Sequence, residues 1–352
     1  VAFKRYETHG FPLDLTEDKI KEKGIKVDID TFDTCMNSQK LIAKSAWKGS
    51  GSTANEGDFR LILNEFGINK FIGYEKNQSK STILALLDEE FKKIDLLETN
   101  QTGWVMLDKT PFYATSGGQN GDTGTIDGRR VTDTQNIFGL NLSKVSSGDS
   151  IDRTLRTGKS IHAIVKKRDE VSKHHSATHL LQSALRIVLG DTVSQAGSLN
   201  DDKRLRFDFT YPKAMTNEQI SEVEEKVNLM IAGGITGNVE ELPIEEAKNK
   251  GAIAMFGEKY GDTVRVVKFG DVSVEFCGGT HVENTANIGS FYILRESGVS
   301  AGVRRIEAVV GKQAIKIMNL QRQKIAHLET ELKTKDILEG VAKLKEQIKK
   351  LK

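Results

Sequence analysis

Two short motifs, far apart in the chain, constrain the fold of this 352-residue sequence more than any other feature. The first is His-Ser-Ala-Thr-His at 175–179, in which His175 and His179 are four residues apart. In a helix, residues at this spacing lie one above the other on the same face. The second is Cys-Gly-Gly-Thr-His at 277–281, which places Cys277 and His281 on a Gly-Gly turn. Imidazoles and a thiolate are typical zinc ligands, so the sequence predicts that the fold brings the two motifs together.

Each motif alone is weak evidence for a metal site. A helical histidine pair is often incidental, and a cysteine beside a turn is often a small buried hydrophobe. The chain, however, has only 2 Cys and 7 His, and one Cys and three His fall in these two motifs. We therefore predict one Zn²⁺ per chain, held by His175, His179, Cys277 and His281, because zinc suits a thiolate combined with imidazoles.

Composition and length limit the class of protein. The chain is long enough for two or three domains, and its net charge of +2 does not by itself indicate a nucleic-acid partner. Two distant cysteines provide no disulfide framework, and a thiolate ligand needs a reducing compartment. The sequence has no apolar run long enough to span a bilayer and no signal-peptide pattern. We expect a soluble cytoplasmic protein with no membrane partner, and the start at Val1 suggests a fragment of a longer chain.

The predicted fold class is α+β, with four parts. Residues 1–98 read as mostly helical, and 99–160 as a small β-barrel with a glycine-dense loop at 116–124. Residues 161–310 interleave strands and helices without a βαβ period, which favours a mixed or antiparallel sheet around both motifs. Thr216 and Gln219 form a predicted capping box at the start of one of its helices. Residues 311–352 read as a long helix, or two broken ones, with a short coiled-coil seam.

The loop at 116–124 contains a Gly-Gly-Gln triplet at 117–119. Peptide-release factors use such a triplet to hydrolyse peptidyl-tRNA. A tight turn at a corner of the barrel explains the two glycines at least as well. The sequence leaves both interpretations open.

The predicted zinc site has four protein ligands, which is ambiguous. Four ligands are typical of a closed structural site, whereas catalytic zinc keeps an open position. Thr178 and Gln195 are the candidate catalytic residues, because a hydroxyl and an amide can hydrogen-bond a small polar substrate. The alternatives are that Thr178 bonds only its own helix and that Gln195 lies on the surface.

Basic clusters provide candidate contacts to tRNA phosphates. Most such clusters are simply solvated faces. The candidates are Lys166, Lys167, Arg168, Arg304 and Arg305, with Arg204 and Arg206 as a further basic pair.

Several stretches together resemble the editing region of alanyl-tRNA synthetase. They are the motifs at 175–181 and 277–281, Ser-Gln-Ala-Gly-Ser at 194–198, Leu-Arg-Phe-Asp at 205–208, Gly-Ala at 251–252, Phe-Gly-Glu-Lys-Tyr-Gly-Asp at 256–262, and Gly-Val-Arg-Arg-Ile-Glu-Ala at 302–308. The glycine-dense loop at 116–124 belongs to the same pattern, and residues 6–16 resemble the segment that leads from the tRNA-recognition part into the editing part. The resemblance covers essentially the whole chain.

The resemblance implies an editing domain like that of threonyl-tRNA synthetase, preceded by a small β-barrel. Its zinc ligands match His175, His179, Cys277 and His281, and its pocket residues match Thr178 and Gln195. The implied partner is tRNA(Ala) mischarged with serine or glycine, whose ester the domain hydrolyses. The family uses ATP and Mg²⁺ in an aminoacylation domain. We expect that domain and the C-terminal globular domain to be missing here, and the intact enzyme is a candidate homodimer.

The sequence departs from the family pattern at two residues of the first motif. His174 replaces the usual Asn and Ser176 the frequent Thr, and neither change removes a ligand. Three rival interpretations are a free-standing trans-editing deacylase, a zinc hydrolase of peptides, and a non-catalytic zinc-stabilised tRNA-binding module. The peptide hydrolase ranks low because the helix lacks the Glu after the first His that metalloproteases use as a base.

Overall fold

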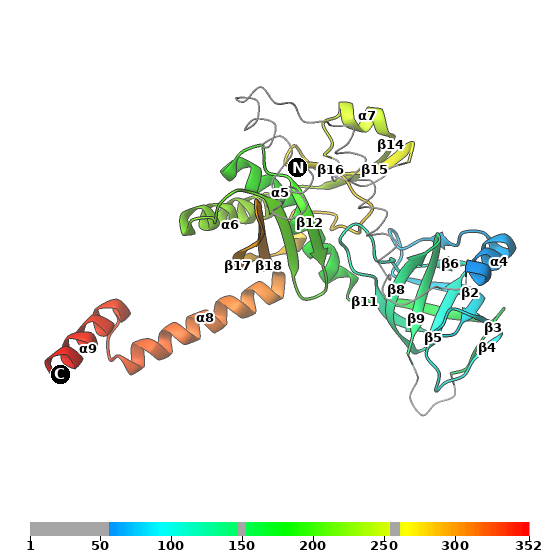
Figure 1. The fold of residues 1–352 in the computed structure, drawn as a ribbon, viewed down its shortest axis with the longest axis horizontal. Coiled ribbons are helices and arrows are strands. Elements are labelled where there is room, and N and C mark those ends of the chain that lie inside the picture. The colour runs from blue at the N-terminus through cyan, green and yellow to red at the C-terminus, as the bar shows by residue number, and fades with distance from the viewer. Residues whose placement is uncertain (1–55, 147–152, 254–260, 352) are drawn as a thin grey trace, which may run out of the picture.

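The computed structural model describes residues 56–146, 153–253 and 261–351 of the chain (Figure 1). Most of the helical region predicted for residues 1–98 falls on residues 1–55, outside the described residues. The described part begins with helix α4 (Glu56–Phe66) and the short strand β1 (Lys70–Phe71). Part of the motif at 256–262 also lies outside the described residues.

Six antiparallel strands form a closed barrel. They are β2 (Gln78–Leu87), β5 (Gly103–Leu107), β9 (Leu140–Val145), β8 (Arg129–Ile137), β7 (Thr123–Ile126) and β11 (Ser160–Lys166). The ring closes because β11 pairs with both β7 and β2. Along β11, buried and exposed residues alternate strictly, as expected for a strand whose one face lines a barrel core. The prediction of a small β-barrel is confirmed.

The barrel begins earlier in the chain than the predicted boundary near residue 99. Strand β2 is one of the six strands of the closed ring, and the short strands β3 (Lys93–Ile94) and β4 (Leu96–Leu97) also precede that boundary. The side chains of Ile83, Ala85 and Leu86 are fully buried. Residues 78–87 are therefore a strand of the barrel, because burying this apolar run requires neighbouring strands.

The second part of the chain packs two long helices, and the short helix α7 (Ile244–Asn249), on two antiparallel sheets (Figure 1). The long helices are α5 (Arg168–Leu189) and α6 (Asn217–Ala232). The four-stranded sheet has the order β12 (Gln195–Asn200), β13 (Leu205–Thr210), β18 (Val303–Val310) and β17 (Phe291–Ser300). The three-stranded sheet has the order β14 (Gly237–Pro243), β15 (Thr263–Phe269) and β16 (Ser273–Phe276).

One apolar core joins these elements and fixes the position of α5. Leu180, Leu181, Phe207, Phe209 and Phe291 are all fully buried in it. Burial of side chains of this size contributes about 1.5–3 kcal/mol each. The polar edge of α5, which carries the histidines, is thus held against the end of the three-stranded sheet.

The start of helix α6 tests one local expectation. The capping box there is confirmed, because Thr216 Oγ1 accepts from Gln219 N at 3.2 Å and Gln219 Oε1 accepts from Thr216 N at 3.0 Å. Helix α5, by contrast, begins after Lys167 in the left-handed conformation (φ 66°), with no side-chain cap and with Asp169 inside the first turn.

The C-terminal segment consists of two helices, α8 (Gly311–Glu331) and α9 (Ile337–Leu351), not one long helix. They project from the body as an arm (Figure 1). Lys333, with φ 51°, lies between them in a conformation that ends a helix. Within the part of the chain that the structure describes, no helix is long and apolar enough to cross a membrane.

Candidate metal centre

The four predicted metal ligands come from two elements and lie together. His175 and His179 occupy adjacent turns of α5, whereas Cys277 and His281 lie in the loop that follows β16. One ligand atom from each residue can be chosen so that all four lie within 4.8 Å of one another. Cys277 Sγ lies 3.4 Å from His175 Nε2 and 3.1 Å from His281 Nε2. The long-range contact predicted from the two motifs is therefore present.

These separations fit a tetrahedral zinc ion. Zn–S bonds of about 2.3 Å and Zn–N bonds of about 2.0–2.1 Å place neighbouring ligand atoms about 3.3–3.6 Å apart. Of the two thiolate-to-imidazole distances given above, 3.4 Å lies within that range and 3.1 Å lies slightly below it. A set of one thiolate and three imidazoles also matches the ligands that zinc prefers. Because all four positions of a tetrahedron are supplied by the protein, the arrangement is typical of a structural zinc site.

The protonation of the three histidines favours metal binding. Burial, together with the positive charge of Arg265, lowers the pKa of His175 to about 3. Burial also lowers the pKa of His179 and of His281 well below the usual value, with neighbouring histidines and Arg265 adding to the effect. All three imidazoles are consequently neutral at pH 7, the state in which a histidine nitrogen can bind a metal.

Two residues outside the motifs hold the loop that carries Cys277. The Arg265 guanidinium donates to the carbonyl oxygens of Cys277 at 2.7 Å and Gly279 at 2.9 Å. The Tyr74 hydroxyl donates to the carbonyl oxygen of Gly278 at 2.6 Å, and the Arg265 guanidinium lies over the Tyr74 ring at 4.2 Å. Three consecutive carbonyls of the loop are thereby fixed, one of them by a side chain from the barrel half of the chain.

Two side chains that are not themselves ligands lie beside His281 and His179. Ser176 Oγ lies 3.0 Å from His281 Nδ1 and accepts from Val282 N at 3.1 Å. Glu275 Oε2 lies 3.7 Å from His179 Nδ1, and burial raises the pKa of Glu275 to about 8. Such outer partners orient metal-bound histidines in many proteins.

The sequence matches two family models and several known proteins. Residues 1–169 match tRNA synthetases class II (A), and residues 264–307 match the threonyl and alanyl tRNA synthetase second additional domain. An alanine–tRNA ligase of Aliarcobacter butzleri (strain RM4018) is 66% identical over 355 residues. Alanine–tRNA ligases of Sulfurimonas denitrificans (strain ATCC 33889 / DSM 1251) and Campylobacter jejuni subsp. jejuni serotype O:23/36 (strain 81-176) are 55% and 54% identical over 354 residues.

The chain belongs to the alanine–tRNA ligase family.

Each of these alignments covers 100% of the chain and 41% of the relative. The chain thus spans less than half of the length of these alanine–tRNA ligases. The second additional domain match, 264–307, includes Cys277 and His281.

The expected activity is corrected by these matches. We expected an editing part that hydrolyses Ser-tRNA(Ala) and Gly-tRNA(Ala) and that lacks the aminoacylation domain. Instead, residues 1–169 match the class II (A) synthetases and residues 264–307 match the second additional domain, so the chain joins a class II synthetase region to a second additional domain. The motifs that suggested editing lie mostly after residue 169. The expectation that ATP and Mg²⁺ belong only to a missing domain depended on the same assumption and is corrected as well.

The two candidate catalytic residues have neighbours within the protein. The Thr178 hydroxyl, which is buried, lies 3.0 Å from the carbonyl oxygen of His174 and 2.7 Å from Asn200 Oδ1. The bond to its own helix is therefore present, but the contact with Asn200 of β12 shows that Thr178 does not bond only its own helix. Gln195 is half-buried at the start of β12, and its Nε2 donates to Ser198 Oγ at 3.0 Å. A catalytic role for Thr178 or Gln195 stays a prediction that the geometry does not test.

The arginines of β18 are paired with carboxylates. Arg304 binds Glu296 through two nitrogens at 2.5 and 2.8 Å, and Arg305 binds Asp208 in the same way at 2.6 and 2.7 Å. These bidentate pairs offset each guanidinium charge across neighbouring strands. Contacts from Arg304 and Arg305 to phosphates would have to compete with these carboxylates, and they stay predictions.

The basic cluster at the end of β11 divides into exposed and buried members. Lys166 is exposed, and Lys167, also exposed, pairs with Asp202 at 2.5 Å. Arg168 is buried and forms an ion pair with the buried carboxylate of Asp122. Contacts from Lys166, Lys167 and Arg168 to tRNA stay predictions, and a contact from Arg168 would have to compete with its ion pair to Asp122.

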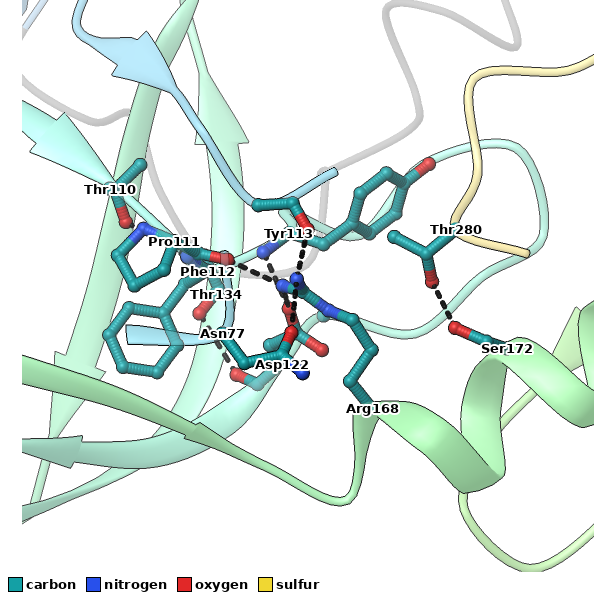
Figure 2. Close-up of polar contacts among 12 residues, drawn as sticks. Asn77, Thr110, Pro111, Phe112, Tyr113, Asp122, Thr134, Arg168, Ser172 and Thr280 are labelled. Atoms are coloured by element: carbon teal, nitrogen blue, oxygen red, sulfur yellow. Dashed lines mark hydrogen bonds and ion pairs between the residues drawn. The ribbon is translucent and has the colours of Figure 1, made fainter. Parts of the chain in front are cut away.

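The network around Arg168 was not predicted from the sequence. Its guanidinium donates to the carbonyl oxygens of Gly73 and Pro111, to Asn77 Oδ1 at 3.1 Å and to Asp122 (Figure 2). All of these acceptors belong to the barrel half, whereas Arg168 is the first residue of α5. The network therefore attaches the helix that carries His175 and His179 to the barrel. The only signal in the sequence is the position of Arg168 at a strand-to-helix junction.

A cavity of about 810 Å³ lies beside the metal ligands, between the barrel half and the three-stranded sheet. Its lining includes His281 and Thr280 of the ligand loop, Tyr74 of the barrel half, and the cations Lys173 and Arg265. A volume of this size is sufficient for a small organic ligand or for the end of a larger one.

The two adjacent glycines of the ligand loop provide a matched pair of variants. A Cβ on Gly279 would lie 2.1 Å from His175 Cε1 and 2.3 Å from His175 Nδ1, whereas a Cβ on Gly278 would meet nothing within 4 Å. We expect Gly279→Ala to displace the His175 ring and to lower zinc affinity at least about tenfold, as loss of ligand orientation does. Gly278→Ala should leave zinc affinity unchanged. Chelator competition measures both, and equal affinities for the two variants would disprove the packing argument.

Proposed function

We propose that this chain is the zinc-containing part of an alanine–tRNA ligase that binds tRNA(Ala), with the cavity beside the ligand loop receiving an end of the RNA. The observation that carries the proposal is the gathering of His175, His179, Cys277 and His281 within 4.8 Å beside that cavity. The relatives are named for joining alanine to tRNA, so tRNA(Ala) is the partner their name supports. We also propose a cytoplasmic location, because a thiolate ligand requires a reducing compartment.

In this proposal Zn²⁺ supplies structure rather than a reaction step. Bound by four protein ligands, it would hold the loop at 277–281 against α5, as closed zinc sites do. The same loop lines the cavity through Thr280 and His281. Arg265 and Tyr74 fix the loop backbone from the other side. Metal binding and the shape of the cavity are thus coupled through one short segment.

The electrostatic contribution would come from lysines in and just before helix α5. The half-buried Lys173 lines the cavity, and the exposed Lys166 and Lys167 directly precede the first residue of α5. Phosphate contacts of this kind make affinity fall as salt concentration rises. Alanine attachment with ATP and Mg²⁺, and a homodimer, are proposed only for the whole ligase.

Binding of tRNA(Ala) to the chain tests the proposal. We expect saturable binding that is tighter than for a non-alanine tRNA and that weakens with salt. Zinc chelation should weaken binding about tenfold or more, because each 1.4 kcal/mol lost by a misplaced loop corresponds to a tenfold change. His162→Gln, which alters an exposed histidine of β11, is the control and should bind as the wild type does. Equal affinity for both tRNAs, or affinity unchanged by chelation, would disprove the proposal.

A further inference from the structure

The Gly-Gly-Gln loop forms a tight turn that delivers one side chain to the metal centre. Ser116 and Gln119 exchange backbone hydrogen bonds at 3.2 and 2.9 Å, and Gly117 and Gly118 between them have φ of 55° and 74°. Positive φ at both central positions is typical of a type I′ turn. A Cβ on Gly118 would lie 2.0 Å from Ser198 Oγ, so glycine permits the loop to lie on β12. The tight-turn interpretation of the triplet is confirmed, and the Gln119 side chain is fully buried.

The Gln119 amide makes three hydrogen bonds inside the metal centre. Its Oε1 lies 2.8 Å from His175 Nδ1 and accepts from Thr280 N at 2.8 Å. Its Nε2 donates to Thr280 Oγ1 at 2.9 Å. A backbone N–H can only donate, so the atom facing Thr280 N must be the amide oxygen. The orientation of the amide is therefore fixed by chemistry.

The same oxygen determines the tautomer of His175. Because Oε1 has no proton to give, His175 Nδ1 must carry one and donate it. In the neutral imidazole this leaves Nε2 without a proton, and Nε2 is the atom that lies 3.4 Å from Cys277 Sγ. A metal can bind only an unprotonated nitrogen. The contact thus directs the free electron pair of His175 toward the other ligands.

We propose that Gln119 is a positioning residue that selects the Nδ1–H tautomer of His175 and thereby presets the metal centre from the barrel half of the chain. This inference rests on the proposed zinc centre.

The other two outer contacts do not impose a tautomer. The Ser176 hydroxyl can either donate to or accept from His281 Nδ1, and Glu275 Oε2 lies 3.7 Å from His179 Nδ1, beyond an ordinary hydrogen bond. The Gln119 amide is neutral at every pH and presents only an acceptor to His175. Among these three outer partners in the described chain, Gln119 is therefore the one that determines which ring nitrogen of its histidine carries the proton.

The direct test reads the tautomer of His175 in the wild-type protein at neutral pH. Long-range ¹H–¹⁵N correlation spectra of the histidine-labelled chain distinguish a protonated Nδ1 from a protonated Nε2. The His175 signals are those that disappear in His175→Gln. We expect the proton on Nδ1. A proton on Nε2 would overturn the proposal. This readout does not require bound zinc, so a failure of the zinc centre and a failure of the tautomer assignment are distinguishable.

Two variants separate tautomer selection from anchoring of the loop. Gln119→Met removes the acceptor at similar volume, and we expect zinc affinity to fall about 10- to 100-fold, as loss of an outer partner does. Thr280→Val removes the hydroxyl that accepts from Gln119 Nε2 and that also contacts Ser172 Oγ at 2.8 Å. It keeps the Gln119 Oε1 contacts, so zinc affinity should change less than about threefold. Chelator competition measures both. Wild-type affinity in Gln119→Met, or equal losses in the two variants, would show that the amide does not act through His175.

Discussion

Replacing Arg168 by methionine is expected to lower the free energy of unfolding by about 3–5 kcal/mol, because removing one partner leaves the other charge buried without compensation. The side chains of Arg168 and Asp122 retain only 6% and 1% of their exposure. Asp122 Oδ2 also accepts from Tyr113 N at 2.7 Å, which holds the carboxylate in place inside the barrel (Figure 2). Denaturant unfolding followed by circular dichroism measures the loss.

The double variant Arg168→Met with Asp122→Leu provides the matched control. Replacing a buried ion pair by apolar residues is often nearly neutral, so the double variant should be more stable than Arg168→Met alone. An exposed ion pair contributes only about 0–1 kcal/mol. A loss in that range for Arg168→Met would contradict the buried network, and it would mean that water reaches Asp122.

Replacing Cys277 by serine is expected to abolish the zinc-dependent part of the stability. A ligand that binds only the folded state stabilises it by about 4.1 kcal/mol at a thousandfold excess over its dissociation constant. Because Cys277 contacts both His175 and His281, losing its thiolate removes the one soft ligand of the set. Unfolding with zinc and with a chelator should differ by several kcal/mol in the wild type and by less than about 1 kcal/mol in Cys277→Ser.

His162→Gln again serves as the control, since His162 is exposed on β11 away from the ligand motifs. It should retain the full difference between zinc and chelator. If Cys277→Ser retained that difference as well, zinc would be stabilising the chain at some other position. A wild type without any such difference would exclude a structural zinc.

The ligand residues could be predicted because local spacing determines them. His175 and His179 share a face in any helix, and Cys277 and His281 flank a glycine turn whatever surrounds them. With few cysteines and histidines in the chain, pairing the two motifs required no knowledge of the fold. The strands of the barrel and the capping box of α6 could be predicted from local patterns in the same way.

The contacts that support the ligands could not be predicted, because they join residues that are distant in the chain. Gln119 reaches His175 and Thr280 only after the barrel loop has packed on β12. Arg168 finds Asp122 only when α5 meets the barrel. In sequence, the first looked like a turn and the second like an exposed basic cluster. Lone glutamines and arginines carry no periodicity that would reveal a buried partner.

The barrel boundary and the class II region were misjudged for a related reason. Strand β2, at residues 78–87, is buried only because strands that follow it in the chain pair with it, so the helical interpretation of residues 1–98 extended too far. The match to class II (A) synthetases covers residues 1–169. The editing resemblance instead rested on compact motifs that lie mainly after that segment.

Cobalt substitution tests the central claim most directly, because Co²⁺ takes the place of zinc and its absorption spectrum reports geometry and ligands. We expect one Co²⁺ per chain, with intense visible bands of a tetrahedral site and a near-ultraviolet thiolate-to-cobalt band. The thiolate band should be absent in Cys277→Ser. Weak bands of an octahedral ion, or a thiolate band that persists in Cys277→Ser, would contradict a site formed by His175, His179, Cys277 and His281.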